Sequence, residues 1–362
     1  MSKFSVVSAD SHVVEPADLW LENIEPAFRD RAPKVIRDDK GEDVFFCDGV
    51  RLLSPAGMST AGRSGDDVDR TLESIYPGAY DPHARVADMV RDGVEAEILY
   101  PSITMRIFAV DDAQLVNACF RAYNTWIAGF CSASPDRYKA VGVIELEDME
   151  GALAEVHRVH KLGLSGLMIT LTSDDPTLYS DTRFEPFWAA AEALGMPVSL
   201  HLVTDKKPLK FDMTTETIAA VDAMRSLANM VFSGLFLRFP RLKVISAEND
   251  AGWAGYFVEK MDYLYQEPRR NVLRDFAIKG KGMLPSDYIK RNVAFTFIYD
   301  RSGVEARHWF GVENLMWSSD YPHNASTWPN SQATLDYLFD GVEESERQLM
   351  VAGNAERMYG WD

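Results

Sequence analysis

Residues 184–202 read FEPFWAAAEALGMPVSLHL, and this stretch carries the pattern that decides the fold. Its first part, Phe184–Leu194, predicts a helix, and Gly195 stands where a helix C-cap belongs. A short run, Pro197–Leu202, follows at once and predicts a β-strand. A strand that alternates with a helix is the repeating unit of a parallel sheet. The sequence therefore predicts an α/β protein.

The same alternation recurs along the whole chain and gives eight predicted strands. These strands are Phe4–Ala9, Val94–Tyr100, Tyr138–Ile144, Leu164–Leu171, Pro197–Leu202, Leu242–Ala247, Asn292–Ile298 and Asn314–Ser319. The helices predicted around them are Ala84–Arg91, Ala113–Ala133, Met149–Leu162, Phe184–Leu194, Thr214–Arg238, Gly252–Gln266, Arg301–Phe310, Ser331–Phe339 and Glu343–Tyr359. Eight strands of this kind predict closure into a (β/α)₈ TIM barrel. An open doubly wound sheet is the second candidate, which is weakened because no G-x-G-x-x-G or P-loop motif follows the first strand.

One segment, Glu15–His83, departs from the pattern of a minimal barrel. It is rich in Pro, Gly and Asp, and it contains one predicted hairpin, Lys34–Ile36 with Val44–Phe46. The long connections that follow barrel strands lie on the face where barrel active sites are built. We therefore expect residues 1–362 to form a single barrel, with residues 15–83 inserted after strand one over the active-site face.

The composition is that of a globular protein, and it excludes several classes of partner. The chain has 362 residues, of which 46% are hydrophobic and 25% are charged, and its net charge is −18. A strongly acidic chain without a Lys/Arg cluster is a poor partner for nucleic acid. No apolar run is long enough to span a membrane, and three cysteines cannot form a disulfide framework. We expect a cytoplasmic protein that acts on a small molecule and contacts neither nucleic acid nor membrane.

A long predicted helix carries an apolar band that bears on assembly. The band consists of Leu227, Met230, Val231, Phe232, Leu235 and Phe236. A helix that is apolar on nearly every side is buried, either in the core or in an interface between subunits. We therefore expect a homodimer or a higher homo-oligomer.

Acidic and histidine side chains stand at the ends of four predicted strands. Asp10 and His12 follow strand one, and their spacing places both side chains on one side of an extended backbone. His201 ends strand five, Glu248 follows strand six and Asp320 follows strand eight. Because the carboxyl ends of barrel strands converge on one mouth, these side chains should meet there. Two imidazoles and two carboxylates suit zinc, manganese or iron, so we predict that Asp10, His12, His201 and Asp320 bind one divalent ion.

The walls of the substrate pocket should come from the insertion and from the loops after the strands. Aromatic residues are frequent in these segments, which favours an aromatic or cyclic substrate. Arg106, shortly beyond strand two, is the cation that we expect to meet an anionic group of the substrate. Trp253, Tyr299 and His323 are the other residues that we expect to contact it.

Several motifs are similar to those of one enzyme family. They are Asp10–Pro16 (DSHVVEP), Tyr80–Pro82 through Asp92–Val94, Ala133–Arg137 (ASPDR), Phe184–Trp188 (FEPFW), Met316–His323 (MWSSDYPH) and Gly353–Ala355 (GNA). On these motifs, nearly the whole chain resembles the amidohydrolase-related metal-dependent hydrolases, in the branch that includes aminocarboxymuconate-semialdehyde decarboxylase and γ-resorcylate decarboxylase. The resemblance implies a distorted (β/α)₈ barrel with one catalytic divalent ion, most often zinc or manganese. It places the ligands of that ion at Asp10, His12, His201 and Asp320.

The sequence departs from the decarboxylases of this branch at one position. Those enzymes carry a histidine at the end of strand six, where it is taken as an acid/base group, and this chain has Glu248 there. A carboxylate favours the positive ion and disfavours an anionic carboxylate of the substrate nearby. We therefore expect a hydrolase, with zinc as the first choice of ion. In it, a metal-activated water attacks an amide, an ester or an activated C–C bond.

Two carboxylates divide the predicted chemistry between them. Asp320 is expected to bind both the ion and the water and to take the proton of that water. Glu248 is expected to orient the water, to act as a second acid/base group or to join the ligands. A nonoxidative decarboxylase of a hydroxybenzoate-like acid is the first alternative function. A dinuclear oxygenase, with Glu248 and His323 as ligands of a second ion, and a binding module without a metal are the others.

Overall fold

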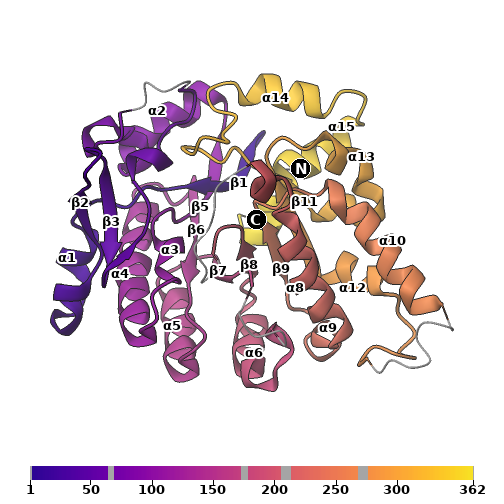
Figure 1. Ribbon diagram of the computed structural model, residues 1–362. Coiled ribbons are helices and arrows are strands. Elements are labelled where there is room, and N and C mark those ends of the chain that lie inside the picture. The colour runs from indigo at the N-terminus through magenta and orange to yellow at the C-terminus, as the bar shows by residue number, and fades with distance from the viewer. Residues whose placement is uncertain (1, 64–68, 173–177, 205–212, 268–275, 362) are drawn as a thin grey trace.

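Eight parallel strands form the central barrel of the protein, and helices surround it (Figure 1). The structure is a computed structural model, and it describes residues 2–63, 69–172, 178–204, 213–267 and 276–361. The strands are β1 Val7–His12, β5 Ala96–Tyr100, β6 Tyr138–Val143, β7 Gly166–Thr170, β8 Val198–His201, β9 Val244–Ala247, β10 Val293–Phe297 and β11 Leu315–Trp317. Each strand pairs in parallel with the next one in this order. The predicted α/β barrel is confirmed.

All eight predicted strands are present, but the first begins and ends later than predicted. The sequence predicts Phe4–Ala9, whereas β1 runs from Val7 to His12. The last residues of β1 are mostly polar, and yet the strand is buried along its whole length. Polar side chains are accommodated there because they bond to one another, as Ser8 Oγ does with Ser319 Oγ at 3.2 Å. The apolar run in the sequence therefore ends at Ala9, before the strand itself ends at His12.

The barrel closes between β1 and β11 without a regular ladder of paired strands. In the described sheet, these two strands stand at opposite ends of the strand order. Two backbone hydrogen bonds connect their carboxyl ends: His12 N donates to Tyr321 O at 2.7 Å, and Asp320 N donates to Asp10 O at 3.0 Å. Residues that we predicted to bind a metal therefore also close the barrel.

Helices cover the outer face of the barrel (Figure 1). The longer ones are α2 Pro82–Asp92, α4 Ala113–Ser132, α5 Met149–Lys161, α6 Glu185–Leu194, α8 Ala220–Phe232, α10 Gly252–Gln266, α12 Pro285–Asn292, α13 Arg301–Phe310 and α14 Ser331–Leu338. The shorter ones are α1 Leu19–Asn23, α3 Thr104–Ile107, α7 Met213–Thr217, α9 Leu235–Arg238, α15 Glu344–Gln348 and α16 Asn354–Tyr359. None of the described helices combines the length and the apolar character that crossing a bilayer requires.

Two predicted helices are interrupted, and the sequence pattern misses three other described helices. The predicted helix Thr214–Arg238 forms α7, α8 and α9, and Gly234, with a φ of 75°, separates the last two. The predicted helix Glu343–Tyr359 is divided by a π-helical turn at Leu349–Gly353. The missed helices are α1, α3 and α12. Helix α12 has only eight residues and most of them are polar, so it is too short for a repeating apolar pattern to mark it in the sequence. Pro285 at its first turn is the main local signal for it.

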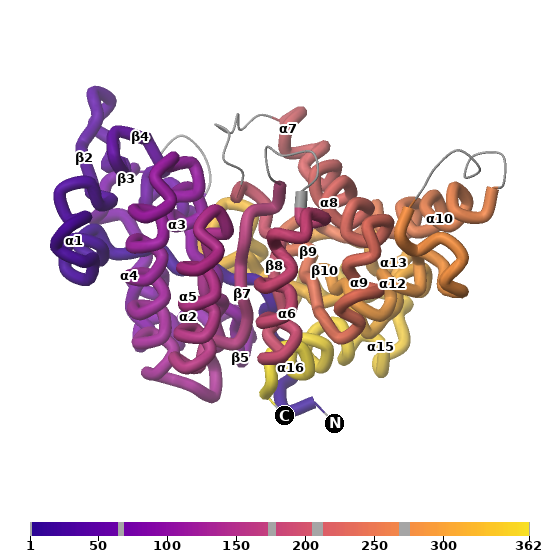
Figure 2. Tube along the Cα trace, turned by 90° about the horizontal axis from the view of Figure 1, so that it is seen from below, coloured from indigo at the N-terminus to yellow at the C-terminus, as the bar shows by residue number. Residues whose placement is uncertain are grey.

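A three-stranded antiparallel sheet is inserted between β1 and β5. It consists of β2 Lys34–Arg37, β3 Asp43–Cys47 and β4 Val50–Arg51, so the predicted hairpin is confirmed and extended by one short strand. The insertion shares the barrel core, because the Trp20 ring packs edge-on against Phe45 and its Nε1 donates to Cys119 O in α4 at 3.1 Å. In Figure 2 the inserted strands and α7 lie toward one end of the molecule, and both chain termini lie toward the other. The boundaries 15–83 stay a prediction, and residues 64–68 of that range lie outside the described residues.

The apolar band that suggested a subunit interface lies in the core of this chain. Leu227, Met230, Val231, Leu235 and Phe236 are all at most 1% exposed. They belong to the main hydrophobic core, which satisfies the apolar character of the band within one chain. The homo-oligomer therefore stays a prediction that this band does not support.

Strand β6 and helix α5 approach each other closely at Gly142. A methyl group on Gly142 would lie 2.5 Å from Val159 Cγ1, well inside van der Waals contact. We expect Gly142→Ala to lower the free energy of unfolding by about 1–3 kcal/mol, because the stiff Val159 side chain or the backbone must move. Urea denaturation measures this change.

Gly129→Ala in α4 is the matched control for this prediction. No atom lies within 4 Å of the methyl group that this substitution adds. Because alanine is the better helix former, the control should raise the free energy of unfolding by about 0.5–1 kcal/mol. Equal stability of the two variants would contradict the tight contact between β6 and α5.

Candidate metal centre

The four predicted ligands meet at one end of the barrel. Asp10 and His12 come from β1, His201 ends β8, and Asp320 lies just beyond β11. The His12 Nε2 atom lies 3.4 Å from Asp10 Oδ1 and 3.4 Å from Asp320 Oδ1, and His201 Nε2 lies 3.5 Å from Asp10 Oδ1. All four side chains are buried. The structure therefore brings together the residues that the sequence singled out.

Backbone carbonyls orient both imidazole rings toward the centre. The Nδ1 atom of His12 lies 2.7 Å from Pro101 O, and the Nδ1 atom of His201 lies 2.7 Å from Leu202 O. A carbonyl can only accept a hydrogen bond, so each Nδ1 carries the proton. The lone pair of each Nε2 is therefore free to face the cluster, which is the arrangement that metal-binding histidines use.

Several polar atoms in the cluster have no hydrogen-bond partner among the described residues. These atoms are Asp10 Oδ1, His12 Nε2, His201 Nε2, and both carboxylate oxygens of Asp320. Buried polar atoms without a partner are costly and call for a missing one. Two imidazole nitrogens with two carboxylates are a donor set that a divalent first-row metal ion prefers. The residues therefore fit a divalent ion.

The charges of the centre favour the same conclusion. Burial would raise the pKa of Asp10, but His201 and His12 outweigh it and hold that pKa below its usual range. Burial raises the pKa of Asp320 to about 7, with Asp10 adding to the shift and the two histidines opposing it. Burial and the neighbouring His323 lower the pKa of His12 to about 4. Burial would lower the pKa of His201, but Asp10 outweighs it and raises that pKa, so an ion would displace a proton there. Two close carboxylates and two imidazoles make a site that gains from a cation and releases protons as the cation binds.

Glu248 stands beside this cluster at the end of β9. Its Oε2 atom lies 3.5 Å from His201 Nε2 and 4.0 Å from His12 Nε2. Burial raises its pKa well above the usual range, and the charges of Asp320 and Asp10 raise it further. Glu248 and Asp320 both adopt a positive φ, of 56° and 54°. Such backbone conformations are uncommon for residues other than glycine and cluster at functional sites.

Thr296 on β10 connects the two groups, and the sequence reasoning missed it. Its hydroxyl accepts a hydrogen bond from Glu248 N at 2.8 Å and donates to Asp10 Oδ2 at 3.1 Å. Thr296 thus binds the side-chain carboxylate of Asp10 and the backbone N–H of Glu248. A single threonine inside a buried strand gives no signal in the sequence, because threonine is also an ordinary strand residue.

His323, which we predicted to contact the substrate, lies against the ligands. Its Nδ1 atom is 3.0 Å from Asp320 Oδ1, and its ring stacks on that of His12 with centroids 3.9 Å apart. Its Nε2 atom is 2.8 Å from Ser102 Oγ, which donates to Val13 O. The two groups of possible ligands in the described residues, one with His201 and one with His323, share His12. The two groups of possible ligands therefore form a single centre around His12.

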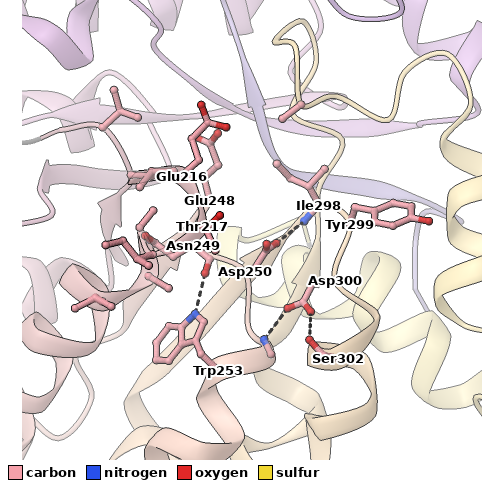
Figure 3. A pocket seen from close by; sticks show the side chains of 18 of the residues that line it. Glu216, Thr217, Glu248, Asn249, Asp250, Trp253, Ile298, Tyr299, Asp300 and Ser302 are labelled. Atoms are coloured by element: carbon pink, nitrogen blue, oxygen red, sulfur yellow. Dashed lines mark hydrogen bonds between the residues drawn. The ribbon is translucent and has the colours of Figure 1, made fainter. Parts of the chain in front are cut away.

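Glu248 lines two cavities. Of the other residues predicted to contact the substrate, Trp253 and Tyr299 line the larger cavity and Arg106 lines neither. The larger has a volume of about 640 Å³, and Trp253 and Tyr299 are among its lining residues (Figure 3). The Trp253 Nε1 atom donates to Asn249 O at 2.8 Å, so its polar edge is already bonded. The Tyr299 ring is exposed and stacks on Tyr337, and in Figure 3 it points away from Glu248.

The smaller cavity, of about 310 Å³, lies between the insertion and the residues Glu248 and His323, which adjoin the proposed ligands. His323 and Glu248 line it on one side, and Arg51 and Arg70 line it from the insertion. Arg106 lines neither cavity; it is buried in α3 and donates from Nη1 to Val203 O at 2.9 Å. Its role toward an anionic substrate stays a prediction.

Comparisons with known proteins support the family that the motifs suggest. A family model described as amidohydrolase matches residues 67–361. The γ-resorcylate decarboxylase of a Rhizobium species is 26% identical over 333 residues, which are 84% of this chain and 94% of that enzyme. Both matches cover most of the chain, and the family model begins after β1.

Solved structures share the fold over nearly the full length. The 5-carboxyvanillate decarboxylase of Sphingomonas paucimobilis is 20% identical, with a TM-score of 0.70 over 99% of both chains. The corresponding enzyme of Novosphingobium aromaticivorans, in complex with manganese and 4-hydroxy-3-methoxy-5-nitrobenzoic acid, is 17% identical, with a TM-score of 0.71 over 99% of this chain and 96% of that one. At such identities the likeness establishes the fold.

The ligand set can be tested through His201. We expect His201→Ala to lower the bound metal by at least about tenfold, because the variant loses one of only a few ligands. Elemental analysis of the purified protein measures the ion content. His157→Ala, which truncates an exposed histidine on α5, is the matched control and should keep its ion. A full ion in His201→Ala would remove this residue from the ligand set.

Proposed function

Because the chain belongs to the amidohydrolase family, we propose that it is a metal-dependent, nonoxidative decarboxylase of a small hydroxybenzoate-like acid. One observation carries this proposal: the γ-resorcylate decarboxylases of Polaromonas and Rhizobium align with 83% and 84% of the chain. It reverses the order expected from the sequence alone, in which hydrolysis comes first. The buried centre beside two cavities is a suitable place for such a reaction.

The proposed ligands are Asp10, His12, His201 and Asp320. Asp10, His12 and His201 form one group of close ligand atoms, and Asp320 joins it through His12, whose Nε2 atom lies 3.4 Å from Asp320 Oδ1. A divalent ion held by these residues would supply a positive charge that stabilises negative charge on the aromatic acid. Zinc suits the imidazoles, and manganese suits the carboxylates and is bound in the Novosphingobium enzyme. We propose one of these two ions as the resident metal.

Decarboxylation needs a proton donor, and Glu248 is proposed for that role. A new C–H bond forms with the Glu248 proton at the ring carbon, the bond to the carboxyl group breaks, and CO₂ leaves as its electrons return to the ring. Water then restores the proton to Glu248. The raised pKa of this carboxyl group favours the neutral acid that the step requires.

The same protonation weakens the electrostatic argument against decarboxylation. An ionised Glu248 would repel the carboxylate of the substrate, whereas a neutral one does not. Burial and the charges of Asp320 and Asp10 favour the neutral form. A bound cation acts in the opposite direction, and the balance between these effects sets the pH range in which Glu248 works as an acid.

The smaller cavity offers two arginines to an aromatic acid, although Glu42 and Glu216 also line it and Arg70 pairs with Glu42 at 3.3 Å. Arg51 and Arg70 lie on its insertion side, and Leu53, Met58 and Met105 supply apolar surface. Arg51 pairs with Asp38 at 3.4 Å, so the substrate would compete with a weak ion pair for its guanidinium group. We propose this cavity as the place where the aromatic ring binds.

Hydrolysis is the second candidate, and Glu248 is the residue that favours it. The family resemblance of the sequence implies an imidazole at the position where this chain has the carboxylate of Glu248. An ionised Glu248 would orient a water molecule, and Asp320 would accept its proton. An amide or ester of a cyclic compound is the substrate class for this candidate.

The two candidates differ in the products they form. We expect the metal-loaded protein to release CO₂ from 2,6-dihydroxybenzoate or 5-carboxyvanillate, which are acids named for its relatives. In D₂O, mass spectrometry should find one deuterium at the ring carbon that lost its carboxyl group, and the metal-free protein should form no product. Cleavage of aromatic esters or amides with incorporation of ¹⁸O from water, and no CO₂ release, would overturn the proposal in favour of hydrolysis.

The role of Glu248 as an acid has its own test. We expect Glu248→Gln to lower the rate of CO₂ release by about 10²–10⁴-fold, because the amide cannot donate the proton, while most of the ion stays bound. Glu248→His is the matched variant, and it should keep more activity than the glutamine variant because imidazolium can donate a proton. The rate of CO₂ release and the metal content are measured for each variant, and together they show whether Glu248 acts as the acid. A parallel loss of ion and rate in Glu248→Gln would make Glu248 a ligand instead.

A further inference from the structure

Arg85 on α2 forms a fully buried ion pair close to the metal centre. Its side chain is 0% exposed. Its Nε atom donates to Glu97 Oε2 at 2.6 Å, and its Nη2 atom donates to Glu97 Oε1 at 3.1 Å, which is the two-point geometry that arginine forms with a carboxylate. Glu97 lies on β5, next to β1 in the sheet. The pair therefore sits beside the strand that carries Asp10 and His12.

The remaining donors of Arg85 bind the backbone at the point where the barrel closes. Its Nη1 atom donates to His12 O at 2.8 Å and to Gly78 O at 3.1 Å, and its Nη2 atom is 3.3 Å from Tyr321 O. The guanidinium group also lies over the Tyr321 ring, 4.9 Å from its centroid. One side chain thus contacts the backbone of a proposed ligand, His12, and that of the residue after Asp320.

Stability alone does not account for this arrangement. A buried ion pair costs desolvation that an apolar pair of the same size avoids. The carbonyl oxygen of Tyr321 already accepts the bond from His12 N, so Arg85 adds a second bond at the seam between β1 and β11. Asp320 stands next to it with a φ of 54°, a conformation that persists only where its surroundings fix it.

We propose that Arg85 is a positioning residue of the metal centre. Through the carbonyls of His12 and Tyr321, it fixes the separation of His12 Nε2 and Asp320 Oδ1, which is 3.4 Å. Arg85 touches neither the ion nor the substrate in this role. The proposal rests on the ligand set and not on the reaction that the centre performs.

Arg85→Lys tests the proposal, because lysine keeps the charge but carries three donors on one nitrogen in place of the five that Arg85 uses. It therefore cannot keep the two-point pair with Glu97 and also bind the three carbonyls. We expect metal-free Arg85→Lys to bind Mn²⁺ at least about tenfold more weakly than the unsubstituted protein, as measured by the electron paramagnetic resonance of free Mn²⁺. The visible absorption of the Co²⁺-loaded variant should also shift, because that spectrum reports ligand geometry. Both measurements are made far below the unfolding temperature and need no substrate.

Arg158→Lys is the matched control on the outer helices. Arg158 forms the same two-point pair with Glu155, at 2.7 Å for both bonds, and donates to the Arg121 carbonyl at 3.0 Å. This variant should lose stability but keep its affinity for Mn²⁺ within about twofold. If it loses Mn²⁺ affinity as much as Arg85→Lys does, the effect is one of general stability and the proposal is overturned.

Unchanged Mn²⁺ affinity and an unchanged Co²⁺ spectrum in Arg85→Lys would also overturn the proposal. If that variant does not fold, Glu97→Gln serves instead, since it removes one charge and keeps the shape of both side chains. It should weaken Mn²⁺ binding at least threefold, and unchanged binding would sink the idea. His201→Ala separates the two levels: if it keeps its ion, the ligand set fails, whereas loss of ion there with normal Arg85→Lys binding refutes the role of Arg85 alone.

Discussion

Two backbone hydrogen bonds close the barrel, from His12 N to Tyr321 O and from Asp320 N to Asp10 O. The residues that make these bonds contain or adjoin the proposed ligands, so barrel closure and ligand spacing share one geometry. A shift of either strand end would break a bond in a buried region, where water cannot replace it. The packing of the eight strands therefore determines where the ligand atoms of the proposed metal centre lie.

Closure also produces the electrostatics of the centre. It brings Asp10, Glu248 and Asp320 into one buried region, where like charges oppose one another's ionisation. The pKa of Asp320 rises to about 7 and that of Glu248 rises well above its usual range, in both cases first through burial. A divalent cation relieves this repulsion among the ligands. The contacts that close the barrel therefore also create the repulsion between carboxylates that favours binding of the ion.

The meeting of the proposed ligands could be predicted, because in a barrel the strand ends that carry these residues lie at one mouth. His201 and Asp320 are far apart in sequence, but each follows a strand, and the ends of parallel strands converge. The first strand was harder to delimit, because its buried polar residues do not follow an apolar pattern. Contacts such as that of Thr296 with Asp10 depend on side chains from separate strands, and no local pattern encodes them. The preference for hydrolysis rested on an ionised Glu248, whose charge state depends on neighbours that only the folded chain supplies.

The insertion has two parts that serve different purposes. Its base, with Trp20 and Phe45, belongs to the hydrophobic core, whereas its rim, with Arg51 and Arg70, reaches the smaller cavity and pairs with carboxylates of the insertion itself. Exchange of the rim would alter the chemistry of the cavity wall and leave the core intact. The inserted segment can therefore be varied as a separate module in laboratory evolution, because its rim is exchangeable while its base keeps the barrel core packed.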